Sequence, residues 1–149
     1  MPSSLVLKGI GSSAPAEKVF LAGYNASGAA RGPGTVVCWD AVASDGFTFV
    51  LPTATGFINY GLLAGVLTDT CSSADYTGAI QAHGPCTALT WGVASTFIPG
   101  AGLIMVADKA YFAYGTDLQR QVQYEPHVNA LQTNATAATL SAKVYLKAM

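Results

Sequence analysis

The chain has 149 residues, a length that suits one domain. Of these residues 51% are hydrophobic and only 10% are charged, well below the roughly 25% charged residues of ordinary soluble domains. The seven basic and eight acidic residues form no basic cluster, and no apolar run approaches the roughly 18 residues of a membrane-spanning helix, so neither nucleic-acid binding nor membrane insertion is expected. So few surface charges suit a free monomer poorly and predict burial of surface in an assembly.

Residues 1–34 are predicted to form an N-terminal strand and an arm or loop, ahead of a β-sandwich or barrel domain over residues 35–149, the two making one structural unit. Residues 1–10 contain only one charge and a short apolar patch, which does not indicate a secretion signal. Within the Gly- and Ala-rich residues 11–34, the patch Val19-Phe20-Leu21 is apolar. Burying a large apolar side chain stabilises by about 1.5–3 kcal/mol, so this patch should dock either on its own core or on another subunit.

Short alternating segments rich in Val, Thr, Phe and Tyr, separated by Gly, Pro and Asp-Gly, predict β-strands along most of the chain. Residues 35–40 and 47–51 flank Asp45-Gly46 and predict a hairpin. Further strands are expected at residues 60–68, 76–83, 88–91, 103–107 and 110–114, the last two joined through Asp108-Lys109.

Toward the C-terminus, residues 118–124 alternate like a half-buried strand, and residues 125–141 resemble a second arm. Residues 128–140 favour either a helical turn or an extended arm. In residues 142–148, Val144 and Leu146 should point inward and Lys143 and Lys147 outward, which fixes the register because a one-residue slip would bury charge.

Together these elements predict an all-β, single-domain β-sandwich or jelly-roll-like barrel of about eight to ten short strands, with long N-terminal and C-terminal arms or loops. The candidate interface consists of apolar and aromatic residues from the arms and from one short strand with aromatics on both faces. Its members are Val19, Phe20, Leu21, Tyr24, Tyr111, Tyr114, Val128 and Leu131.

No motif for catalysis is present. Cys38, Cys71 and Cys86 are an odd number without the close spacing of zinc ligands, so buried thiols are expected. His83 is expected to be exposed or hydrogen-bonded and His127 to lie in a loop. The sequence contains no nucleophile elbow, P-loop or dinucleotide fingerprint, so no catalytic residue, metal or cofactor is predicted.

Three segments, residues 62–69, 74–76 and 78–86, followed by residues 88–91 and the closing residues 138–149, resemble capsid decoration (cement) proteins of tailed bacteriophages. The resemblance covers about half of the chain and rests on degenerate strand–loop–strand motifs; residues before Gly34 depart from it. It implies a non-enzymatic protein that binds the major capsid protein on the outside of the virion, at junctions between capsomers. It also implies a homotrimer, made in the host cytoplasm, that stabilises the shell.

Three alternatives remain at this point. A tail or fibre component should contain a fibrous repeat, and the sequence shows none. A glycan-binding β-module would use the aromatic residues as a sugar platform. A Cys/His hydrolase would need a histidine beside one of the three cysteines.

Overall fold

The structure is a computed structural model that describes residues 17–43, 45–52, 62–91, 98–106, 109–114, 128–133 and 138–148. Within these residues it contains strands and turns and no helix, which confirms the all-β fold. The strands are β1 (Val19–Asn25), β2 (Val36–Trp39), β3 (Thr48–Val50), β4 (Leu63–Leu67), β5 (Tyr76–Trp91), β6 (Gly102–Met105), β7 (Phe112–Tyr114), β8 (Val128–Ala130) and β9 (Thr139–Lys147).

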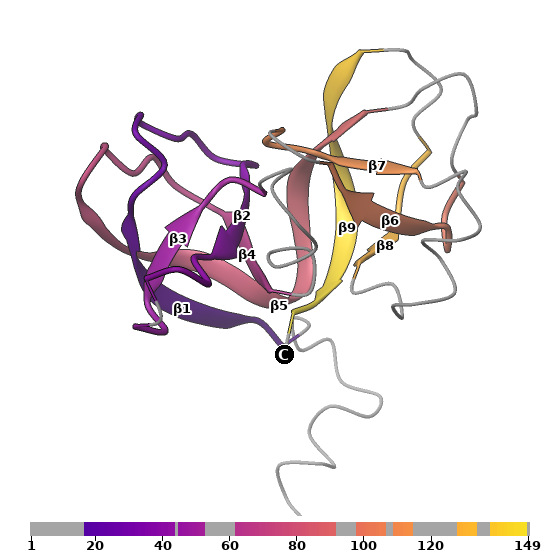
Figure 1. Cartoon of the computed structure of the whole chain (residues 1–149). Helices are drawn as coiled ribbons and strands as arrows, with labels where there is room; N and C mark the ends of the chain where they lie inside the picture. Colours follow the sequence, from indigo (N-terminus) through magenta and orange to yellow (C-terminus); the bar gives the residue numbers. More distant parts are fainter. Residues whose placement is uncertain are drawn as a thin grey trace, which may run out of the picture.

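The strands close into two rings that share the long strand β5 (Figure 1). In the first ring, β1 and β4 both pair with β5, and the order β1-β3-β2-β4 completes the circuit. In the second ring, β7 and β9 both pair with β5, and β7-β6-β8-β9 completes the circuit. The predicted barrel is therefore confirmed in a doubled form. Each of the named strands has a neighbour on both edges, so none is a free edge strand onto which a partner strand could add along its full length.

The two rings have the same connectivity. In each ring the first strand is parallel to the third and antiparallel to the fifth. The second strand pairs with the third and the fourth, and the fourth pairs with the fifth, all antiparallel. Strand β5 is the fifth strand of the first ring and the first strand of the second. This arrangement is an internal structural repeat.

Equivalent turns support this repeat. Gly34 and Gly100 each follow a proline, with φ of 85° and 90°, in the left-handed region that glycine adopts readily. The N–H of Gly34 donates to the carbonyl oxygen of Leu67 at 2.7 Å, and the N–H of Gly100 donates to that of Ala130, also at 2.7 Å. In each ring, this bond connects the turn before the second strand to the last residue of the fourth strand.

Strand β5 corrects the expectation of two separate strands at residues 76–83 and 88–91. Gly84-Pro85 does not end the strand, because Pro85 remains paired with Tyr145 of β9. Gly84 has φ of 90°, and a Cβ atom there would lie 2.2 Å from the carbonyl oxygen of Glu17. Glycine thus allows the chain before β1 to approach closely where β5 passes from the first ring to the second.

The hydrophobic core has two parts because β2 and β4 are buried on both faces. Val37 of β2 faces the first-ring core, whereas Val36 and Cys38 face the other way. The first-ring core consists of Val37, Phe49, Ala64, Leu67, Cys71 and Ile80. The shared core contains Val36, Cys38, Leu63, Val66, Cys86, Ala88, Leu103, Met105, Phe112, Val128, Ala130, Val144 and Leu146. The wall of the first ring therefore packs against the interior of the second.

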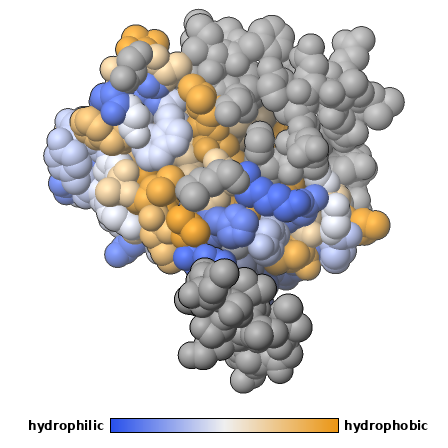
Figure 2. Space-filling view, turned by 90° about the horizontal axis from the view of Figure 1, so that it is seen from below, coloured by the Kyte–Doolittle hydropathy of each residue, from blue (hydrophilic) through white to orange (hydrophobic). Residues whose placement is uncertain are grey.

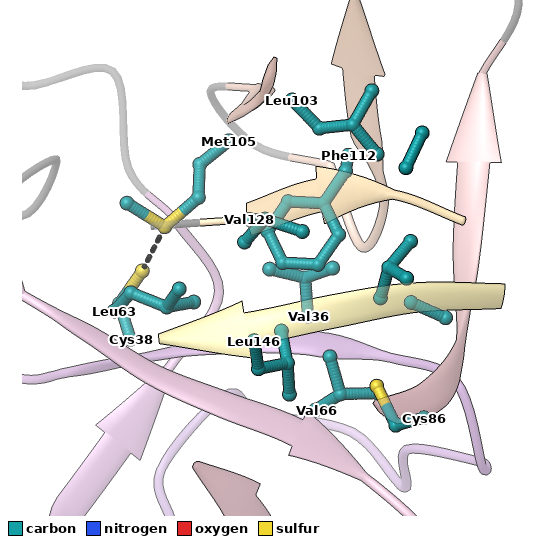
Figure 3. Close-up of a cluster of buried hydrophobic side chains, with 13 residues drawn as sticks. Val36, Cys38, Leu63, Val66, Cys86, Leu103, Met105, Phe112, Val128 and Leu146 are labelled. Atoms are coloured by element: carbon teal, nitrogen blue, oxygen red, sulfur yellow. Dashed lines mark hydrogen bonds between the residues drawn. The ribbon is translucent and has the colours of Figure 1, made fainter. Parts of the chain in front are cut away.

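Side chains from both rings meet around Phe112 in the shared core (Figure 3). The Cys38 thiol from β2 donates to the sulfur of Met105 in β6 at 3.1 Å. The N–H of Val36 donates to the carbonyl oxygen of Ala110 at 3.0 Å, which adds a backbone link between the rings. This packing joins the rings into one structural unit.

Other predicted elements are found with shifted ends. The hairpin around Asp45-Gly46 is confirmed, since β2 and β3 are antiparallel, and so is the pairing of β6 with β7. The register of β9 is confirmed because Val144 and Leu146 are buried and Lys143 and Lys147 exposed. In residues 128–140 the described parts are extended as β8 and the start of β9, so the helical alternative is wrong there. Residues 118–124 lie outside the described part.

Candidate interaction surface

Four of the predicted interface residues lie on β1, which is an integral strand of the first ring. Val19 and Leu21 are half-buried, and Leu21 packs against the first-ring core. Phe20 is 49% exposed, and Tyr24 is half-buried at the end of the strand. The apolar patch of the N-terminal segment thus docks partly on the core of its own chain through Leu21. It also leaves Phe20 on the outside.

The other four predicted residues belong to the second ring. Val128 is buried in the shared core and is therefore inaccessible in the single chain. Tyr111 is half-buried and stacks on Trp91, with ring centroids 5.7 Å apart. Leu131 is exposed, and Tyr114 pairs with β6 through its backbone, its side chain lying outside the described part. Among the seven predicted residues whose side chains the structure describes, Val128 is buried, so these seven do not form one exposed surface.

Three aromatic side chains do gather at one end of the first ring of strands. We call Tyr24, Phe47 and Tyr76 the aromatic surface. The Tyr24 and Tyr76 ring centroids are 5.0 Å apart, and those of Phe47 and Tyr76 are 6.3 Å apart with an interplanar angle of 23°. Tyr76 is 70% exposed and Phe47 is 43% exposed. Sequence reasoning identified only Tyr24 and treated the other two as ordinary strand residues.

The backbone fixes the three aromatic side chains relative to one another. Tyr24 and Tyr76 are direct partners across β1 and β5, and the N–H of Tyr24 donates to the carbonyl oxygen of Phe47 at 2.9 Å. Asp45 caps the turn before β3 by accepting the N–H groups of Phe47 at 3.0 Å and Thr48 at 2.8 Å. The hydrogen bond from the Thr48 hydroxyl, followed by backbone donors, lowers the pKa of the Asp45 carboxyl below its usual value.

A signal for the two missed residues exists in the sequence. Phe47 follows Asp45-Gly46, and Tyr76 follows Asp75. Aspartate favours turns, and turns lie at the surface, so an aromatic residue directly after one is less covered than an aromatic in the middle of a strand.

Buried Asn25 holds the loops beside the aromatic surface. Its side-chain Nδ2 donates to the carbonyl oxygens of Ala29 at 3.0 Å, Ser72 at 2.9 Å and Cys71 at 3.3 Å. Its Oδ1 accepts the N–H of Ser27 at 3.0 Å and the hydroxyl of the same residue at 2.7 Å. One side chain thus joins the loop after β1 to the loop before β5. This network fixes the end of the ring that carries the aromatic surface.

The three cysteines are free and buried, as the sequence predicts. Burial raises the pKa of Cys38 to about 12 and that of Cys86 also to about 12, with Lys18 opposing the shift at Cys86. Burial, with a smaller contribution from the Asp75 charge, raises the pKa of Cys71. A protonated thiol is a poor nucleophile, so this environment does not favour the Cys/His hydrolase alternative.

His83 is half-buried, and its Nε2 lies 3.3 Å from the Tyr145 hydroxyl, which confirms the prediction of a hydrogen-bonded histidine. His127 lies outside the described residues. Among the residues that the structure describes, no three His, Cys, Asp or Glu side chains converge as metal ligands would. The same residues include no helix long and apolar enough to cross a membrane.

Large apolar side chains are also exposed outside the aromatic surface. In the view of Figure 2, hydrophobic residues gather in several groups separated by hydrophilic ones. Besides Phe47 and Tyr76, the exposed large apolar residues in the described part of the chain are Phe20, Val42, Leu62, Ile98, Leu131 and Leu140. The aromatic surface differs from them because its rings contact one another and its backbone is fixed.

No protein-family model matches the chain, and no curated protein matches it significantly.

Proposed function

We propose that this protein is a non-enzymatic structural component of a phage virion. It binds the major capsid protein on the outer surface of the capsid and stabilises the shell at capsomer junctions. The observation that carries most weight is the aromatic surface, in which three aromatic side chains cluster on a closed ring of strands and two of them are substantially exposed. Clustered aromatics are enriched where proteins contact one another.

The low charge of the chain supports attachment through apolar contacts. Exposed ion pairs are worth only about 0–1 kcal/mol each, and the chain has seven basic and eight acidic residues to form them. Burial of apolar surface is favourable by roughly 25 cal/mol per Å², and aromatic side chains provide a large area each. Because the named strands are paired on both edges, side-chain contacts rather than strand addition make the attachment in this proposal.

The proposal includes a homotrimer. A chain with 51% hydrophobic residues should bury part of its exposed apolar surface against copies of itself. Light scattering on the purified protein at micromolar concentration should give three times the mass of one chain. A monodisperse monomer, stable in solution, would contradict trimerisation in the free protein.

The double variant Phe47→Ser/Tyr76→Ser should bind particles lacking the protein at least about 10-fold more weakly than the natural chain, because hot-spot aromatics contribute about 2 kcal/mol or more. Co-sedimentation with such particles measures the loss. Ile98→Ser is the matched control, since it removes an exposed apolar side chain from the second ring. Equal binding of the double variant and the natural chain would overturn the assignment of the attachment surface.

Glycan binding is the second candidate, because the nearly parallel rings of Phe47 and Tyr76 could stack on the face of a sugar. A glycan array probed with the isolated protein distinguishes glycan binding from capsid attachment. Binding to a defined glycan that the double variant loses would favour the glycan-binding function.

A further inference from the structure

A cavity of about 550 Å³ lies where the two rings meet, away from the aromatic surface. Its wall combines the residue before β1, the end of β4, the middle of β5 and the exposed face of β9. Both rings therefore contribute to it, and neither ring alone would form it. Pockets at such junctions are common ligand sites because they are concave and held by rigid elements on several sides.

The charge in this cavity is positive. Lys18 and Lys143, two of the seven basic residues, line it, and the described lining residues include no Asp or Glu. In the described part of the chain, no carboxylate forms an ion pair with either ammonium group. Thr87 and Ser141 add hydroxyl groups to the same wall, whereas the Thr68 hydroxyl there already donates to the carbonyl oxygen of Ala79 at 3.1 Å. Ammonium and hydroxyl groups are donors suited to carboxylate or phosphate oxygens.

A buried side chain adds a second, independent feature. Gln81 lines the cavity and is only 1% exposed. Its Nε2 donates to the carbonyl oxygens of His83 at 3.0 Å and Pro85 at 2.9 Å, which fixes the amide. No donor among the described residues reaches its Oε1. A buried acceptor without a donor is unfavourable, and a ligand hydroxyl would supply that donor.

We propose that this cavity binds a small organic anion that carries a carboxylate or a phosphate together with a hydroxyl group. Lys18 and Lys143 bind the anionic oxygens, and Gln81 accepts a hydrogen bond from the hydroxyl. This site is independent of the capsid attachment proposed above, because it shares no residue with the aromatic surface.

The probes are citrate, which has carboxylates and a hydroxyl, tricarballylate, which is citrate without the hydroxyl, and glucose 6-phosphate. Each is titrated into the isotope-labelled full chain to about 10 mM, a range that detects millimolar affinity, while NMR follows Thr68, Thr87 and the Gln81 side-chain amide. Citrate or glucose 6-phosphate should shift these signals, and whichever binds more tightly identifies the anionic group. If citrate binds, tricarballylate should bind several-fold more weakly.

Lys18→Gln/Lys143→Gln should weaken binding at least about 10-fold, the factor that corresponds to loss of two charge-assisted contacts. Lys109→Gln changes an exposed lysine outside the cavity and should leave binding unchanged. Because both cavity lysines are exposed, the double variant should keep the natural spectrum elsewhere. The proposal is overturned if none of the three anions shifts the cavity signals, or if the double lysine variant responds like the natural chain.

Discussion

Phe112→Ala should lower the free energy of unfolding by about 3–5 kcal/mol, the usual cost of truncating a fully buried phenylalanine. Phe112 is fully buried and lies among shared-core residues from both rings (Figure 3). The loss should therefore destabilise the first ring as well as the second, although Phe112 belongs to β7.

Two tryptophans allow each ring to be followed during urea denaturation. Trp39 lies on β2 of the first ring, and Trp91 ends β5 in the second. In Trp39→Phe and Trp91→Phe backgrounds, the fluorescence of the remaining tryptophan should give the same midpoint, and Phe112→Ala should shift both midpoints equally. Ile98→Ala, at a position 63% exposed, should change stability by no more than about 0.5 kcal/mol. An unchanged Trp39 transition in Phe112→Ala would contradict the shared core.

Asn25→Ala should lower the free energy of unfolding by about 3 kcal/mol or more. The substitution leaves several polar groups in the two loops without their partner, and each buried unsatisfied group costs about 1–3 kcal/mol. Asn25→Asp should be similarly destabilising, since a carboxylate cannot donate to the carbonyl oxygens that Nδ2 now contacts.

Thermal unfolding of both variants measures this effect. Ser27→Ala is the control, because it removes the hydroxyl that bonds Asn25 and Arg31 but leaves the N–H of residue 27 bonded to Asn25. Its free energy of unfolding should fall by only about 1–2 kcal/mol, since a lost hydrogen bond typically costs about 0.5–1.5 kcal/mol. A melting temperature of Asn25→Ala equal to that of the natural chain would show that the two loops are held by other contacts.

The sequence predicted those features that depend on local periodicity. Alternation placed Val144 and Leu146 inside β9, and Asp45-Gly46 located the first hairpin, because strand pleat and turn chemistry act over a few residues. It also predicted a barrel or sandwich without showing how the strands pair. The pairing of β1 with both β3 and β5 connects residues far apart in the sequence, and no local pattern encodes it.

Two features escaped prediction for related reasons. The internal repeat is one of strand connectivity, and its equivalent turns share little beyond Pro33-Gly34 and Pro99-Gly100, so no sequence period revealed it. The aromatic surface depends on β1, β3 and β5 meeting at one end of a closed ring, which places Phe47 beside Tyr76. Val128 was assigned to an interface for the converse reason, because an apolar residue next to a polar segment can equally be core, and here it is.

The most direct test of the proposed function is a salt wash of purified phage particles that carry this protein. Apolar contacts are little screened by salt, whereas charge-dependent contacts weaken as ionic strength rises. In roughly molar salt the Debye length falls to about 3 Å, and the protein should nevertheless sediment with intact particles. Quantitative release of the protein by this wash, with the shell otherwise intact, would contradict attachment through the aromatic surface.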